Sequence, residues 1–255
     1  MLPVIFLEIP TYALFATIGL LCATVFIYIR MDNIQLAFRE LVIYIFFCAL
    51  FALIFARILF VVALIPQMHV SVENIIHNLV NGGIVFYGGM MGFILGILVA
   101  SKLLKRDSKL MMDFIIPAVP LFHFFARIGC LFAGCCYGIP FGIGVINQGE
   151  NIIRLPIQGI ESLCNAIIFW MLIRRNLRKR TYRNNLEIYL IGYSVCRFVL
   201  EFFRGDSIRG IWFNILSTSQ IISIILFGVA LYRLFRSEIQ ETPNNHEKDV
   251  ITKQI

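Results

Sequence analysis

The sequence predicts an all-α, polytopic membrane protein with seven transmembrane helices. Apolar residues make up 59% of the 255 residues, and the mean hydropathy is +0.84. This composition is too apolar for an ordinary soluble domain. The apolar residues also gather into runs of about 20, the length that a helix needs to cross roughly 30 Å of hydrocarbon.

Seven such runs follow one another along the chain. The predicted spans are residues 8–29, 41–65, 85–104, 111–133, 159–173, 186–203 and 215–235. The fifth and sixth spans are short and carry polar side chains, so their ends are the least sharply defined. We expect one transmembrane catalytic domain over residues 1–237 and a polar, disordered cytoplasmic tail over residues 238–255.

The positive charges predict the orientation, because Lys and Arg near span ends stay on the cytoplasmic side. Of the 22 Lys and Arg residues, all but six fall in the links after spans 1, 3 and 5, at the end of span 7 or in the tail. The N-terminus is therefore expected outside and the C-terminus inside. The net charge of +7 follows from this topology and does not imply nucleic-acid binding.

The six exceptions are all arginines on the predicted outer side. Three lie within spans and three in external links: Arg57, Arg127 and Arg197, then Arg154, Arg204 and Arg209. An arginine within a span costs about 2.5–3.5 kcal/mol on insertion scales, so it normally faces a partner, a cavity or a pore. Together the six arginines predict a site for an anionic ligand.

The sixth span carries a polar stripe. Its members recur at intervals of four, four and three residues and so share one face of a helix: Tyr193, Arg197, Glu201 and Arg204. An Arg197–Glu201 pair that only lowers the cost of burial is an alternative explanation. That pair would leave Arg127 and Arg204 without a counter-charge.

Two groups of glycines flank the start of the third span. Gly88, Gly92 and Gly96 are spaced four residues apart, which predicts a groove for close helix packing. Asn81 is followed by Gly82 and Gly83, whose exposed backbone N–H groups suit the approach of a ligand.

The fourth span ends with Cys130, Cys135 and Cys136, with His123 nearby. A metal site is one interpretation, but adjacent cysteines fit a tetrahedral site poorly and the spacing matches no standard zinc or iron–sulfur pattern. We therefore predict no metal and no cofactor. A disulfide on the oxidising side of the membrane and simple packing both remain open.

These segments, in this order, resemble the prolipoprotein diacylglyceryl transferase family. The resemblance extends over nearly all of the transmembrane part: Tyr12, Arg57, residues 81–92, residues 127–138, residues 154–158 with Glu161, residues 193–204, and Ser219 with Gln220. It implies transfer of the diacylglyceryl group of phosphatidylglycerol to the lipobox cysteine thiol of prolipoproteins. Glycerol phosphate would be released at the outer leaflet of the bacterial cytoplasmic (inner) membrane, by a monomer.

The resemblance also implies site residues. Arg127 and Arg197 match the family's headgroup arginines, and Glu201 and Tyr193 would hold Arg197 in place; with Tyr87, the expected catalytic set is Arg127, Arg197, Tyr87 and Glu201. The expected substrate-binding residues are Tyr12, Arg57, Asn81, Gly82, Gly83, Gly134, Gly138, Gln158, Glu161, Tyr193, Arg204 and Gln220.

The chain departs from the family pattern where the acceptor would be activated. Tyr87 and Leu155 replace histidines, Cys130 replaces an asparagine and Cys135 replaces an acid. Tyr87 is a poor base at its ordinary pKa of about 10. The alternatives for that role are Glu161, Glu201 and Asp206.

Two other functions are also compatible with the sequence. A divergent family member could transfer a glyceryl lipid to an acceptor other than a lipobox thiol. An anionic-lipid transporter could also use arginines within its spans, but it should show inverted repeats or paired broken helices, and the sequence shows neither.

Overall fold

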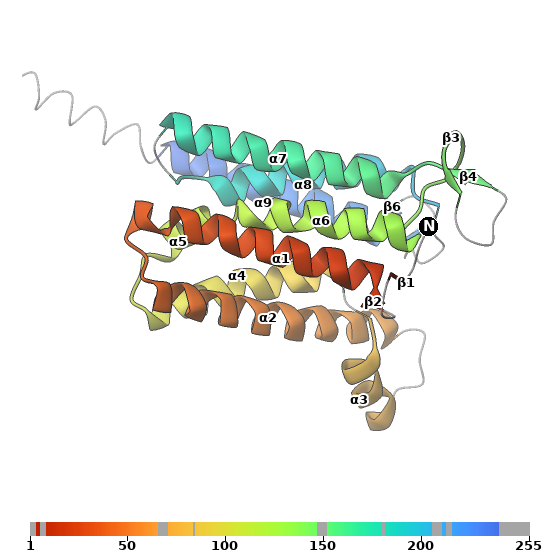
Figure 1. Ribbon diagram of the computed structural model, residues 1–255, viewed down its shortest axis with the longest axis horizontal. Helices are drawn as coiled ribbons and strands as arrows, with labels where there is room; N and C mark the ends of the chain where they lie inside the picture. The colour runs from red at the N-terminus through yellow and green to blue at the C-terminus, as the bar shows by residue number, and fades with distance from the viewer. Residues whose placement is uncertain are drawn as a thin grey trace, which may run out of the picture. The chain divides into compact units, whose positions relative to one another are not determined.

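The computed structural model describes residues 4–5, 9–65, 71–83, 85–146, 152–179, 182–205, 211–212 and 216–239. Helices dominate these residues, and three short antiparallel strand pairs accompany them (Figure 1). The chain divides into two compact units, one formed by Met1–Ala23 with Ile116–Ile255 and the other by Thr24–Ile115.

The unit Thr24–Ile115 is built on two packed helices, α2 and α4. Its elements are the second part of α1 (Thr11–Arg30), the 3-10 helix Met31–Ile34, α2 (Phe38–Leu64), α3 (Val72–Asn81), α4 (Phe86–Leu103) and α5 (Ser108–Ile115). The Ser71 side chain caps the start of α3 by accepting a 3.2 Å hydrogen bond from the backbone N–H of Asn74. Helix α3 is short and ends at Asn81, and the longer apolar helix α4 begins at Phe86.

The three evenly spaced glycines of α4 let α2 approach at backbone distance. A side-chain carbon on Gly96 would lie 2.7 Å from the Cα of Cys48, and one on Gly92 or Gly88 would meet the carbonyl oxygen of Phe51 or Phe55. No side chain fits in that space, so the packing interpretation of these glycines is confirmed.

Gly92→Ala should therefore destabilise the α2–α4 pair. The added methyl group meets backbone atoms, which cannot rotate away, so a cost of about 1–3 kcal/mol is expected. Thermal unfolding in detergent measures it, and Gly89→Ala is the matched control because its nearest neighbour, the Cβ of Ala56, would be 3.8 Å away. Equal melting temperatures for the two variants would contradict the close packing.

The unit formed by Met1–Ala23 and Ile116–Ile255 is built on four helices that pack in sequence order. After the first part of α1 it contains α6 (Ala118–Ala133), α7 (Ile157–Lys179), α8 (Asn185–Glu201) and α9 (Thr218–Ile239). Its strand pairs are β1 (Val4–Ile5) with β2 (Ile9–Pro10), β3 (Pro140–Ile146) with β4 (Ile153–Arg154), and β5 (Ile211–Trp212) with β6 (Leu216–Ser217). Helix α6 packs on α7, α7 on α8, and α8 on α9.

Helix α1 joins this unit through aromatic and glycine contacts with α6. The rings of Phe15 and Phe132 stack at 5.4 Å, and a side-chain carbon on Gly129 would lie 2.9 Å from the Cβ of Phe15. The end of α6 and the starts of α7 and α9 meet the end of α8 at one end of the unit (Figure 1).

Six helical segments in the described part are long and apolar enough to cross a membrane. They are Thr11–Ile34, Phe38–Val62, Phe86–Leu103, Ser108–Ala133, Ile157–Arg178 and Thr218–Ser237. The predicted sixth span coincides with α8, which has 17 residues and buries Glu187, Arg197 and Glu201; as a membrane span it remains a prediction. Helix α9 continues to Ile239, and the rest of the predicted tail lies outside the described residues.

Candidate functional site

The loop that follows α6, residues 137–139, lies between the segment before α7 and the segment after α8. The Ile139 N–H donates to the carbonyl oxygen of Phe203 at 2.9 Å, and the Gly205 N–H donates to that of Tyr137 at 3.0 Å. On the other side, the Leu155 N–H donates to the Ile139 carbonyl at 3.0 Å. Backbone bonds therefore hold this loop between the segment that leads into α7 and the segment that leaves α8.

Gly138 makes this arrangement possible. A side-chain carbon there would lie 2.5 Å from the Leu155 carbonyl oxygen, so the backbones could not approach. The Gly138 carbonyl accepts a 3.4 Å hydrogen bond from Arg154 Nη1, and Gly138 forms an isolated bridge with Arg204. The Arg154 guanidinium also lies 4.4 Å above the Tyr137 ring. Two arginines predicted in separate external links are thus brought to one loop.

Glu161 joins three helices through two buried ion pairs. Its Oε2 lies 2.7 Å from Arg127 Nε on α6, and its Oε1 lies 2.7 Å from Arg197 Nη1 on α8. Glu161 itself stands on α7 and is 6% exposed. Charged pairs of this length are strong where water is excluded.

Glu201 extends the same network. Its Oε2 lies 2.6 Å from Arg197 Nη2, the pair expected from the stripe on α8, and 3.8 Å from Arg204 Nη1. The Arg197 Nη2 also donates to Ser219 Oγ on α9 at 3.1 Å. Three guanidinium groups face two carboxylates, which leaves one formal positive charge in a poorly hydrated region. An anionic ligand is the natural complement.

Arg127 and Arg197 differ in what their terminal nitrogens contact. Both terminal nitrogens of Arg197 bind a carboxylate, and its side chain is 6% exposed. Arg127, at 12% exposure, uses Nε for Glu161 and for a 3.3 Å contact with His123 Nε2. Within the described residues, its two terminal nitrogens have no further partner. Arg127 therefore has donors to offer a ligand, whereas Arg197 links the helices.

Aromatic and amide side chains support the network. Tyr193 packs its ring against His123 at 5.4 Å and stacks on Tyr189 at 5.8 Å. Gln158 is fully buried and its amide nitrogen donates to the Cys135 carbonyl. Tyr12 lies in the first turn of α1, with its Cα close to Gly129 of α6.

Gln220 has a local structural role at the start of α9. Its Oε1 accepts from the Ser217 N–H at 2.9 Å, and its own N–H donates to Ser217 Oγ at 3.2 Å. This reciprocal pair is a helix N-terminal capping arrangement. It fixes the turn that presents Ser219 to Arg197.

The unit Thr24–Ile115 holds the remaining predicted residues. Arg57 of α2 donates through Nη1 to the carbonyl of Gly82, which follows α3. A side-chain carbon on Gly83 would lie 2.8 Å from the Phe60 ring. The Tyr87 ring lies edge-on to Phe86 at 5.8 Å. In this unit, the two glycines after Asn81 pack against the Phe60 ring, and the carbonyl oxygen of Gly82 accepts a hydrogen bond from Arg57.

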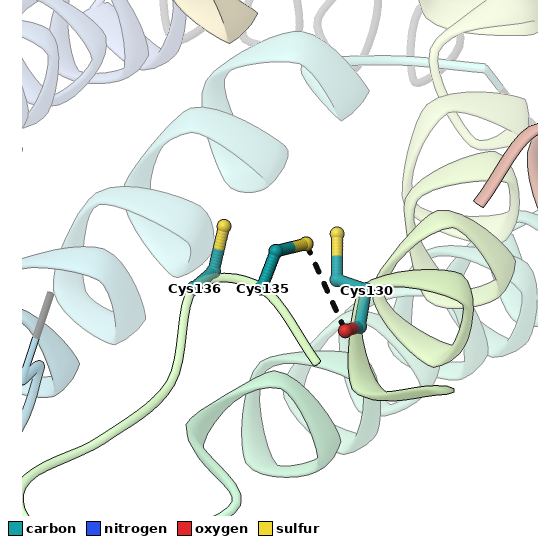
Figure 2. Close-up of side chains that lie close together, drawn as sticks. All are labelled: Cys130, Cys135 and Cys136. Atoms are coloured by element: carbon teal, nitrogen blue, oxygen red, sulfur yellow. Dashed lines mark hydrogen bonds between the residues drawn. The ribbon is translucent and has the colours of Figure 1, made fainter. Parts of the chain in front are cut away.

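The three cysteines around the end of α6 lie together (Figure 2). Their Sγ atoms are all within 4.8 Å of one another, and all are free thiols in the structure. Hydrogen bonds from Cys130 and Cys135 lower the pKa of Cys136, and the charges of Arg127 and Arg204 act in the same direction. Gly134, in the left-handed conformation with φ of 76°, ends α6 and starts the turn that gathers them.

The sequence does not predict that Glu161 bridges Arg127 and Arg197. An acidic residue at the start of an apolar span predicts a cationic partner. The sequence does not indicate which of the arginines that partner is. Glu161 and Glu201, both considered as bases, are held by arginines. Asp206, the third candidate base, and Arg209 lie outside the described residues.

The chain is similar to known proteins over most of its length. Residues 1–236 match the prolipoprotein diacylglyceryl transferase family. A phosphatidylglycerol–prolipoprotein diacylglyceryl transferase of Clostridium tetani is 32% identical over 181 residues, covering 66% of this chain and 72% of that protein.

Two further relatives carry the same activity in their names. The second such transferase of Clostridium perfringens is 33% identical over 60% of this chain, and that of Acinetobacter baumannii strain ACICU is 30% identical over 60%. The alignments span 62% and 60% of those two proteins. With its apolar helices and its match over almost the entire length, the chain belongs to the prolipoprotein diacylglyceryl transferase family.

Proposed function

We propose that this chain transfers the diacylglyceryl group of phosphatidylglycerol to the cysteine thiol of a prolipoprotein lipobox and releases glycerol phosphate. The names of its relatives support this activity. The observation that carries it is the surplus of guanidinium groups over carboxylates at the end of α6, α7 and α8. A singly charged phosphodiester complements that surplus.

The chemistry explains why arginine suits this place. When the glyceryl carbon–oxygen bond breaks, the phosphate changes from a singly charged diester toward a doubly charged monoester. Hydrogen bonds from guanidinium groups therefore strengthen as the reaction proceeds, which lowers the barrier. Arginine also donates two parallel bonds to phosphate, whereas lysine presents a point charge.

We assign the arginines two roles, which their contacts support. Arg127 binds Glu161 through Nε. Its terminal nitrogens therefore contact the phosphate. Arg204 assists from the loop side, since it is 3.8 Å from Glu201 and its backbone pairs with Gly138. Arg197 positions the others, because its terminal nitrogens already bind Glu161 and Glu201.

The site is proposed to face the outer leaflet of the bacterial cytoplasmic membrane, in a monomer of seven spans with an external N-terminus. The distribution of Lys and Arg supports this orientation. Helix α8 supplies the sixth of these spans, since its 17 residues rise about 25 Å. Its ionisable residues are tolerated there because they pair with one another.

Tyr87 is proposed to contribute a hydrogen bond during acceptor binding. Tyr87→Phe removes only the hydroxyl group, so the rate of transfer should fall about tenfold if that hydroxyl binds the acceptor, the equivalent of one ordinary hydrogen bond. Initial rates at saturating phosphatidylglycerol measure this. An unchanged rate would assign the ring to packing against Phe86.

A transfer assay tests the function. The purified protein is incubated with phosphatidylglycerol and a lipobox peptide, and mass spectrometry follows both products. Glycerol phosphate and a thioether-linked diacylglyceryl peptide are expected in equal amounts. A peptide with serine in place of the cysteine should stay unmodified. Glycerol phosphate without peptide modification would favour a different acceptor, and lipid movement without cleavage would favour transport.

A further inference from the structure

The three thiols at the end of α6 form a preassembled group of ligands. Cys130 stands on the last turn of the helix and is buried, Cys136 is partly buried, and Cys135 is exposed. Around a tetrahedral ion with metal–sulfur bonds of about 2.3 Å, sulfur atoms stand roughly 3.8 Å apart. The Sγ atoms already lie within 4.8 Å of one another, so small rotamer changes would bring them to that spacing (Figure 2).

The backbone conformation at Cys136 allows two adjacent cysteines to share one site. Neighbouring side chains of an extended chain point to opposite sides. Cys136, however, has a φ of 57°, in the left-handed region that non-glycine residues seldom occupy. The turn places its thiol beside that of Cys135 (Figure 2). The Gln158 amide holds the Cys135 carbonyl and the Tyr137 carbonyl accepts from Gly205, so the unusual conformation is fixed on both sides.

The charges around the thiols favour an anionic metal–thiolate group. Arg127 lies one helical turn before Cys130, and the charges of Arg127 and Arg204 both act on Cys136. Three thiolates around a divalent ion carry one net negative charge. The guanidinium groups of Arg127 and Arg204 would stabilise that charge electrostatically.

We propose that Cys130, Cys135 and Cys136 bind one Zn²⁺ ion and leave its fourth position for the acceptor thiol. Thiolates select zinc or monovalent copper over harder cations. No other His, Cys, Asp or Glu of the described residues joins the group. Three protein ligands with one open position are the pattern of catalytic zinc sites. The exposed Cys135 side gives the acceptor access.

The fourth-ligand part of this inference rests on the proposed function. A free thiol has a pKa of about 8.5, and a thiol that coordinates zinc is deprotonated outright. The acceptor thiol would release its proton to water as the zinc–sulfur bond forms. The sulfur then bonds to the glyceryl carbon while the carbon–oxygen bond breaks, and the phosphate keeps that electron pair. Glu161 and Glu201 need not act as bases, which agrees with their ion pairs.

Cobalt substitution tests the site without measuring catalysis. The reduced, full-length protein in detergent is titrated with Co²⁺, whose sulfur-to-metal charge-transfer bands report thiolate ligands. About one equivalent should bind per chain, and Cys130→Ser or Cys136→Ser should abolish the bands. The matched control is Cys164→Ser with Cys196→Ser, which removes a contacting thiol pair elsewhere and should leave the bands intact.

Adding a lipobox peptide then tests the fourth position. The cysteine peptide should intensify the charge-transfer bands, and its serine counterpart should not. Absent bands, bands that survive Cys130→Ser, or a disulfide within the cluster of the active protein would overturn the site. An unchanged spectrum with the cysteine peptide would overturn its role for the acceptor.

Chelation separates this inference from the proposed function. Metal-free protein should lose transfer and regain it with Zn²⁺. Full transfer by metal-free protein would refute the zinc role and leave the transferase assignment standing. An intact cobalt spectrum in a protein that never releases glycerol phosphate would refute the transferase assignment and leave the metal site standing.

Discussion

Arg127→Lys should lower the turnover number about 100- to 1000-fold, with little change in folding. Lysine keeps the positive charge beside Glu161 but cannot offer the two terminal nitrogens that Arg127 leaves for a ligand. Removing one donor to charge that develops in a transition state typically costs this much. Turnover under saturating phosphatidylglycerol and thermal unfolding in detergent provide the two measurements.

Arg233→Lys is the matched control for that variant. Arg233 stands on α9, pairs with Glu187 at 3.0 Å, and has a side chain that is 54% exposed. The same chemical change there should leave turnover at the wild-type value. If Arg127→Lys also retained wild-type turnover, Arg127 would not contact the reacting phosphate.

Glu161→Gln should have the largest effect on stability. The carboxylate forms ion pairs with both Arg127 and Arg197, each at 2.7 Å, and all three side chains are at most 12% exposed. Removing one member of a buried charged set leaves uncompensated charge and costs about 3–5 kcal/mol. We expect a marked fall in melting temperature and loss of transfer, since Arg127 would also lose the partner that orients it.

The control for this variant is Glu187→Gln. Glu187 is buried, but its partner Arg233 remains largely in solvent, so the loss should be nearer 1 kcal/mol or less. Similar melting temperatures for the two glutamine variants would contradict the bridging role of Glu161.

The helices could be predicted because their driving force is local. A run of apolar residues near 20 long has to form a helix to satisfy its backbone in lipid, and the spans expected at 41–65 and 85–104 correspond to Phe38–Leu64 and Phe86–Leu103. Helix α3 was not anticipated, because only ten residues with a serine cap form it. Such a short segment gives no hydropathy signal.

The site could be predicted only in part, because its geometry depends on distant backbone pairings. The four-residue spacing on α8 predicts that Arg197 faces Glu201, and the pair is present at 2.6 Å. Nothing local reveals that Glu161 joins α6 to α8. A shared site for the three cysteines is one interpretation of the sequence but not the predicted one, because their grouping depends on the left-handed Cys136 and on the bonds of residues 137–139 to residues 203–205.

Together these contacts describe a positively charged cluster held in place by several helix ends. Arg197 links α8 to α7 through Glu161 and to α9 through Ser219. Arg127 and Arg204 are then held by carboxylates that are themselves fixed. A site preorganised in this way needs little rearrangement when a phosphate enters.

Lipid binding measured by native mass spectrometry tests the central claim most directly. The detergent-purified protein is presented with equal amounts of phosphatidylglycerol and phosphatidylethanolamine, whose headgroup carries no net charge. Wild-type protein and Arg233→Gln should retain phosphatidylglycerol preferentially, and the double variant Arg127→Gln with Arg204→Gln should lose that preference. Equal retention of the two lipids by the wild-type protein, or an unchanged preference in the double variant, would contradict the account.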